Sequence, residues 1–300
     1  MAWNSRNYTL FDKMKLKQYR WRRTLKLTGA RWVETAGDER AATFAFYLLL
    51  SLLPLILLLV TAGSVFVERE VAAQAVANVA RHYIPLTDEQ EREAVSAIHG
   101  MLDTNAPISL AALPLLLWGS LKFLRTLIRN SNRIWNSPSY NWWQLPLRSL
   151  GLLAITTSAI MIGILVPGLA RLVRSWLAAH LDFSPWAFSL VFQIIPWLVL
   201  FYGLLMIYWV SPSRTTKFTD VWLGAVGATA LIWLGQRLFL FYVTTVEPFN
   251  VLYGTLGGIV AFLIWLYLSS CVAVLGICFC AAQAEAKTDA SIDPGDEANQ

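Results

Sequence analysis

The chain has 300 residues, of which 56% are hydrophobic and 14% are charged, and its formal net charge is +5. Soluble domains usually carry about 25% charged residues, so this composition excludes an ordinary soluble protein. A basic chain can indicate a nucleic-acid-binding protein, but here the Lys and Arg residues flank apolar runs and do not form one folded face. We therefore expect an all-α polytopic membrane protein that has no nucleic-acid partner.

The first 40 residues are polar and basic, and they lack the short apolar segment of a cleavable signal peptide. Between residues 10 and 31, Trp, Tyr and Leu are mixed with Lys and Arg. This composition is typical of an amphipathic helix that lies on an anionic leaflet. A basic arm in solvent is an equally good interpretation.

Six later segments are long and apolar enough to cross a hydrocarbon core of about 30 Å. They lie at residues 41–67, 107–128, 148–170, 186–210, 221–245 and 254–281. Proline kinks helices, and four prolines lie in or near these spans: Pro54, Pro114, Pro167 and Pro196. We expect a six-helix transmembrane domain over residues 41–283, with kinked spans that either line a cavity or only pack.

The polar segments predict the rest of the organisation. Residues 68–106 form an external loop, in which residues 71–81 and 88–103 have the pattern of two short helices. Residues 284–300 are acidic and lack apolar periodicity, which predicts a disordered tail. Six spans place both termini on the same side of the membrane. The segments on that side hold 18 of the 24 Lys and Arg residues, those on the opposite side hold five, and Arg237 lies within a span. The positive-inside rule therefore places residues 1–40 and 284–300 in the cytoplasm.

No group of residues in the sequence predicts catalysis. His82, His99 and His180 lie in the predicted external loops without metal-ligand spacing, and there is no phosphate-binding glycine loop. Cys278 and Cys280 are two residues apart, so a helix points them to different faces and a shared metal ion is disfavoured. We expect no enzyme activity, no metal and no cofactor.

Arg237, beside Gln236, is the charged residue that lies well inside a predicted span. A charge at the bilayer centre costs about 2.5 to 3.5 kcal/mol on insertion scales, so it needs compensation. Either the side chain extends to the outer interface, or it faces the bundle and binds an anionic solute or lipid headgroup. On the second interpretation, the candidate substrate path includes Arg237 and Gln236. It also includes Gln193 in the fourth predicted span and three residues of the turn after the fifth, Glu247, Asn250 and Tyr253.

Gly254, Gly257 and Gly258 lie at the start of the last span, where small residues allow close approach of another helix. This pattern predicts helix packing, either within one chain or in a homo-oligomer.

Several motifs resemble those of the YihY/BrkB family of bacterial inner-membrane proteins. They are Asp-Glu-Arg-Ala-Ala-Thr-Phe-Ala-Phe-Tyr from residue 38, with Ser51 and Pro54 following it, Asn-Arg-Ile-Trp at 132–135, Tyr-Gly-Thr-Leu-Gly-Gly-Ile at 253–259, and Leu-Ile-Trp-Leu-Tyr-Leu-Ser-Ser at 263–270. The resemblance runs from about residue 30 to 283. It implies a multi-pass protein of the bacterial inner membrane with both termini inside, and not the ribonuclease that an older family label suggests.

The last span departs from the family. Members usually have Gly-Ala-Glu-Leu-Asn-Ala, whereas here Cys278 and Cys280 replace the acid and the amide. Any role of that glutamate elsewhere is therefore in doubt for this chain. The resemblance supplies no settled activity. We expect a transporter or lipid translocator with membrane lipids as partners, with a non-transporting envelope scaffold as the alternative.

Overall fold

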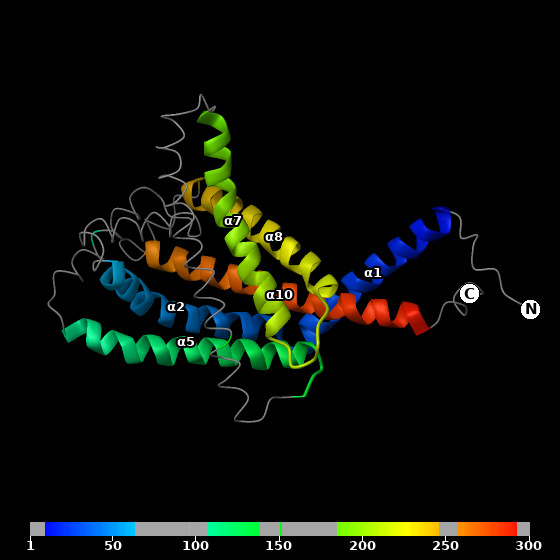
Figure 1. Ribbon diagram of the computed structural model, residues 1–300, viewed down its shortest axis with the longest axis horizontal. Helices are drawn as coiled ribbons and strands as arrows, with labels where there is room; N and C mark the ends of the chain where they lie inside the picture. Colours follow the sequence, from blue (N-terminus) through cyan, green and yellow to red (C-terminus); the bar gives the residue numbers. More distant parts are fainter. Residues whose placement is uncertain are drawn as a thin grey trace, which may run out of the picture.

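The computed structural model describes residues 10–63, 96, 107–138, 151, 185–245 and 257–292. These residues form α1 (Leu10–Glu34), α2 (Gly37–Gly63), α5 (Pro107–Ile134), α7 (Pro185–Val210), α8 (Phe218–Thr245) and α10 (Gly257–Ile292). In Figure 1, α2, α5 and α10 run side by side, α7 and α8 cross them, and α1 leads away towards the N-terminus. The described part of the chain is thus entirely helical, as the sequence predicts.

Five of the six predicted spans coincide with α2, α5, α7, α8 and α10, and α5 and α7 continue through Pro114 and Pro196. The span at 148–170 and the loop at 68–106 lie outside the described residues, apart from residues 151 and 96. Within the described residues, two segments are long and apolar enough to cross a membrane: Phe218–Val243 and Gly258–Thr288. The number of six spans therefore stays a prediction.

Helix α10 is longer than its predicted span. Its 36 residues correspond to about 54 Å at about 1.5 Å per residue, well beyond a hydrocarbon core of about 30 Å. It continues to Ile292, so residues 284–292 are helical and are not part of a disordered tail. Charged residues alone suggested disorder, but Glu285 forms an ion pair with Arg31 and Lys287 forms one with Asp220. The sequence does not show these distant partners.

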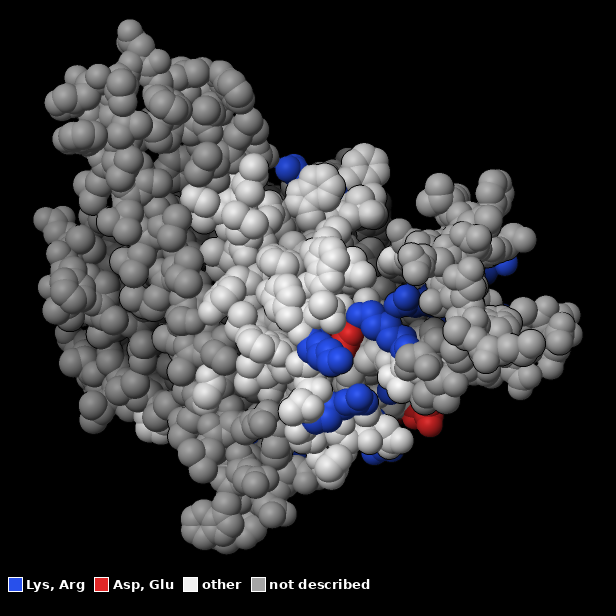
Figure 2. Space-filling model, turned by 45° about the vertical axis from the view of Figure 1, so that its right-hand side comes forward, with Lys and Arg blue, Asp and Glu red and all other residues white. Residues whose placement is uncertain are grey.

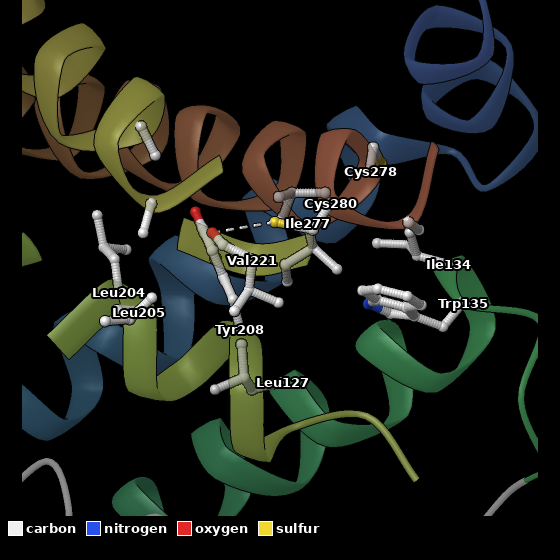
Figure 3. Close-up of a cluster of buried hydrophobic side chains, with 14 of the residues drawn as sticks. Leu127, Ile134, Trp135, Leu204, Leu205, Tyr208, Val221, Ile277, Cys278 and Cys280 are labelled. Carbon is white, nitrogen blue, oxygen red and sulfur yellow. Dashed lines mark hydrogen bonds between the residues drawn. The ribbon is translucent and has the colours of Figure 1, made fainter. Parts of the chain in front are cut away.

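The main buried core lies where α2, α5, α7, α8 and α10 meet (Figure 3). Tyr208 of α7 is fully enclosed, and its hydroxyl donates a 3.0 Å hydrogen bond to the carbonyl oxygen of Ala273 in α10. Figure 3 also shows the Cys280 thiol directed at the carbonyl oxygen of Val221, at a distance of 3.7 Å. Cys280 and Cys278 are both buried in this cluster.

Two glycines allow helices to approach α10 closely. A Cβ atom on Gly224 of α8 would overlap the Cys280 sulfur, and one on Gly276 would overlap the phenol of Tyr208. Gly227, one turn further along α8, has no atom within 4 Å of the same position. The cysteine and the tyrosine therefore occupy the space that the missing side chains leave.

Gly224→Ala should destabilise the protein, because the new methyl group must displace the Cys280 sulfur and push α8 away from α10. We expect the free energy of unfolding to fall by about 1 to 3 kcal/mol, as overpacking usually costs. Gly227→Ala is the matched control, and it should be neutral or slightly stabilising because alanine favours helix by up to about 1 kcal/mol. Denaturant unfolding in mild detergent measures both.

Cys280→Ala in the Gly224→Ala background should restore part of the loss, since it removes the overlapping atom. Equal stabilities of the Gly224 and Gly227 variants would contradict the close contact.

Candidate functional site

Arg31, near the end of α1, contacts the ends of two other helices. Its guanidinium donates a hydrogen bond to the carbonyl oxygen of Ile134, the last residue of α5, and forms an ion pair with Glu285 of α10. The last carbonyl groups of a helix lack partners within the helix and carry partial negative charge. Arg31 therefore binds the C-terminal parts of α5 and α10 to α1.

Arg40, in the first turn of α2, makes a second set of links. Its Nε donates to the carbonyl oxygen of Thr35, in the turn between α1 and α2, and its Nη1 donates to Oδ1 of Asn130 in α5. Both acceptors are neutral, and no described carboxylate forms an ion pair with Arg40. We call the group formed by Arg31, Arg40, Asn130, Asn132 and Glu285 the arginine junction.

The environment of Arg40 opposes its positive charge. Burial and the nearby positive charge of Arg133 lower the pKa of Arg40 from its usual value, and the smaller opposing effects of Cys278 and Glu39 do not reverse this shift. A guanidinium nevertheless stays protonated in proteins. Arg40 is thus a half-buried cation held by neutral groups, and a negatively charged ligand would stabilise it.

The end of α5 positions the two asparagines of the junction. Asn136 has a positive φ of 49°. The Ser137 amide donates to the carbonyl of Asn132 at 2.8 Å, and that of Asn136 donates to the carbonyl of Arg133 at 3.2 Å. This is the Schellman pattern of a helix end. It leaves the Asn132 side chain to accept a 2.7 Å hydrogen bond from the amide of Ser213, between α7 and α8.

Three buried donors at the end of α5 and in the turn after it have no hydrogen-bond partner: Nδ2 of Asn130, Oγ of Ser131 and Nε1 of Trp135. These residues are 6%, 0% and 4% exposed, respectively. Buried polar groups are almost always hydrogen-bonded, so three unpartnered donors in six residues require an explanation. An amide nitrogen and an indole nitrogen can only donate, which matches them to a ligand rich in acceptor oxygens.

Two further buried atoms have no hydrogen-bond partner: Nε of Arg125, five residues before Asn130 in α5, and Oε1 of Gln283 in α10. The first is again a donor and the second is an acceptor. Figure 2 shows many of the Lys and Arg side chains gathered in one region, with little acidic surface beside them and a wide uncharged surface adjoining. The arginine junction itself holds two arginines and one glutamate, and most of the unpartnered atoms named above are donors.

The residues that the sequence predicts for a substrate path lie elsewhere or outside the described residues. Arg237 is exposed on α8, with its guanidinium 5.9 Å from the ring centre of Trp233, and Gln236 beside it is half-buried. Gln193 belongs to α7, but its side chain lies outside the described residues. So do the following residues entirely: Glu247, Asn250, Tyr253 and Gly254. Gly257 and Gly258 begin α10. The roles of these residues stay predictions.

Sequence reasoning missed the arginine junction, although two motifs pointed to it. Arg40 belongs to the motif that starts at residue 38, and Asn132 and Trp135 belong to the motif at 132–135. In the sequence both motifs indicated only a family resemblance. The structure shows that the helices that carry them, α2 and α5, pack against each other. In the ranges that the structure describes, no three His, Cys, Asp or Glu side chains come together as metal ligands. The three histidines lie outside those ranges.

Comparison with known families agrees with the motifs that meet at the junction. The family model described as virulence factor BrkB matches residues 28–300. The chain belongs to the virulence factor BrkB family. This match includes every residue of the arginine junction.

Relatives of this BrkB-family chain carry two kinds of name. A protein of Bacillus subtilis (strain 168), named YfkH and described as ribonuclease-like, is 26% identical over 84% of this chain and 92% of its own length. A UPF0761 membrane protein of Pseudoalteromonas atlantica is 25% identical over 79% of this chain and 77% of its own. Another, from Aeromonas salmonicida, is 25% identical over 82% and 84%, respectively. No solved structure matches significantly. With its apolar helices, the chain is an integral membrane protein.

Arg31→Gln should destabilise the protein more than Glu285→Gln does. The glutamate is 41% exposed in its side chain, and an exposed ion pair contributes about 0 to 1 kcal/mol. The arginine also stabilises the end of α5, and a hydrogen bond from a charged group contributes about 1.5 to 3 kcal/mol. Denaturant unfolding of the two variants checks the order, and equal losses would show that the bond to Ile134 contributes nothing.

Proposed function

We propose that this BrkB-family protein is a multi-pass protein of the bacterial inner membrane, with both termini in the cytoplasm, that translocates an anionic lipid or solute. The observation that carries the proposal is Arg40, a half-buried cation whose acceptors are neutral and which contacts Asn130, whose buried Nδ2 has no hydrogen-bond partner. A negatively charged group at this position would receive charge-assisted hydrogen bonds, which are about twice as strong as neutral ones.

The position of Arg40 suits the cytoplasmic end of such a path. It immediately precedes the first predicted span, which begins at residue 41, so it would lie near the level of the lipid headgroups. Its neighbour Asn130 lies just beyond the second predicted span. Phosphate and carboxylate groups are the negatively charged groups of lipids and solutes at that level.

Arg237 supplies a second cation for the path in this proposal. Counted from the start of its predicted span, it lies about 24 Å along the helix axis, in the outer half of the membrane. The two arginines would then bind the negative group near opposite ends of the path. The other proposed path residues are Gln236, Gln193, Glu247, Asn250 and Tyr253. The proposal includes no catalytic role, which agrees with the naming of relatives as membrane proteins.

Arg40→Gln should remove a bound anion, because glutamine keeps a donor but loses the charge. We expect the amount of one anionic lipid or metabolite that co-purifies with the protein to fall about 10-fold to 100-fold, which corresponds to a charged hydrogen bond of about 1.5 to 3 kcal/mol. Mass spectrometry of lipids and solutes retained in mild detergent measures it. Arg40→Lys should keep part of the binding.

Arg129→Gln is the control, since Arg129 is an exposed cation of α5 that is not part of the arginine junction. An unselective profile that is identical in the Arg40 and Arg129 variants would contradict the proposal and favour the scaffold. Once the ligand is named, Arg237→Ala should leave the protein folded but abolish its flux in vesicles, and full flux would remove Arg237 from the path.

The orientation has its own test. Fusions of a periplasm-dependent and a cytoplasm-dependent reporter to residue 292 should show activity only of the cytoplasmic one, because the positive side of the chain faces inward. A cysteine introduced in residues 68–106 should react with an impermeant thiol reagent from outside. The reverse pattern would contradict the proposed topology.

A further inference from the structure

The described side chains of helix α1, from Tyr19 to Glu34, include both buried and exposed residues. Its most buried residues include Thr24 and Thr28, and the helix packs mainly against α10. Both threonine hydroxyls donate to carbonyl groups four residues earlier, at 2.8 and 2.7 Å, so their polar groups are satisfied within the helix. The packed face of α1 therefore includes small polar residues as well as Trp32, which packs against the main core.

The large apolar residues form an exposed stripe beside that face. Trp21, Leu25 and Val33 follow one another at multiples of four positions, which places them along one side of a helix. They are 43%, 59% and 79% exposed, respectively. Trp21 lies at the edge of the stripe, where its ring centre is 5.8 Å from that of Phe279 in α10. Leu25 and Val33 face away from the bundle.

Basic residues border the stripe. Arg22 and Lys26 are four positions apart and both are exposed, and their helical positions flank that of Val33. The combination of a tryptophan, aliphatic side chains and adjacent cations is the pattern of a helix that lies in a membrane interface. A nucleic acid would use the cations but would leave Leu25 and Val33 in water, so a lipid surface fits both parts of the pattern.

The junction holds α1 close to such a surface. Two residues separate the end of α1 at Glu34 from the start of α2, and the bonds of Arg40 to Thr35 and of Arg31 to Ile134 fix this turn. Because α2 is a predicted span, the turn lies at the level where it enters the bilayer. We infer that the stripe Trp21, Leu25 and Val33, with Arg22 and Lys26 beside it, binds α1 to the anionic surface of the leaflet next to the junction.

This inference needs α2 to enter the membrane near residue 37, and it is independent of the translocation proposed above. Of the two interpretations that the sequence left open for residues 10–31, it favours a helix on the lipid surface over an arm in solvent. Each Lys or Arg near an anionic surface contributes about fivefold to the binding constant. Screening should weaken the interaction strongly, since raising the salt from about 0.1 M to about 1 M shortens the Debye length from about 10 Å to about 3 Å.

The test uses the full chain with an environment-sensitive fluorophore on Leu25→Cys, in nanodiscs of phosphatidylcholine with or without about 30% phosphatidylglycerol. The native cysteines are buried or half-buried, and the unsubstituted protein gives the labelling background. We expect a blue-shifted emission, quenched by spin-labelled lipid, only in the anionic nanodiscs and at low salt. Arg22→Gln with Lys26→Gln should lower the docked-to-undocked ratio about thirtyfold.

The control variant carries Arg129→Gln and Lys217→Gln, two exposed cations outside α1, and changes the net charge equally. It should keep the blue shift. The same emission in both lipid compositions, or an unchanged shift in the Arg22 and Lys26 variant, would overturn the inference. An emission that changes with protein density and not with lipid would assign the stripe to a second copy of the chain, and would overturn it as well.

Discussion

Arg31 and Arg40 satisfy backbone carbonyl groups where α1 and α5 end, and the described structure is organised around these bonds. The same two side chains reach Glu285 of α10 and Asn130 of α5, so four helices meet at one place. Helix ends that are removed from water need such partners, because an unsatisfied buried carbonyl is costly. The arrangement also leaves Arg40 without a negative partner among the described residues, and from this the proposed anion binding follows.

Away from the junction, small residues determine how closely the helices pack. Gly224 and Gly276 bring α8 and α7 against α10, and the Cys280 sulfur and the Tyr208 ring fill the space. In a bilayer the lipid tails are as apolar as leucine, so helix association depends on such close packing more than on hydrophobic burial. Cys278 and Cys280 serve here as compact packing groups in the core.

The sequence predicted the all-helical fold because an uninterrupted run of about 20 apolar residues can be recognised without tertiary information. It placed the helix ends less well. Helix α2 begins at Gly37 and not at residue 41, since Asp38 and Glu39 are polar but favour the first turn of a helix. Helix α5 likewise extends past residue 128 to Ile134. The junction could not be predicted, because its partners are 90 and 254 positions apart and no local pattern joins them.

The length of α10 couples two parts of the molecule through helical phase. Cys280 must face α8, while Glu285 must face Arg31 and Lys287 must face Asp220. One residue inserted between Cys280 and Glu285 would turn everything after it by about 100° and advance it by about 1.5 Å. Both ion pairs would then be lost together, although every residue in them would still be present. The spacing between Cys280 and Glu285 is therefore as important to these contacts as the residues that make them.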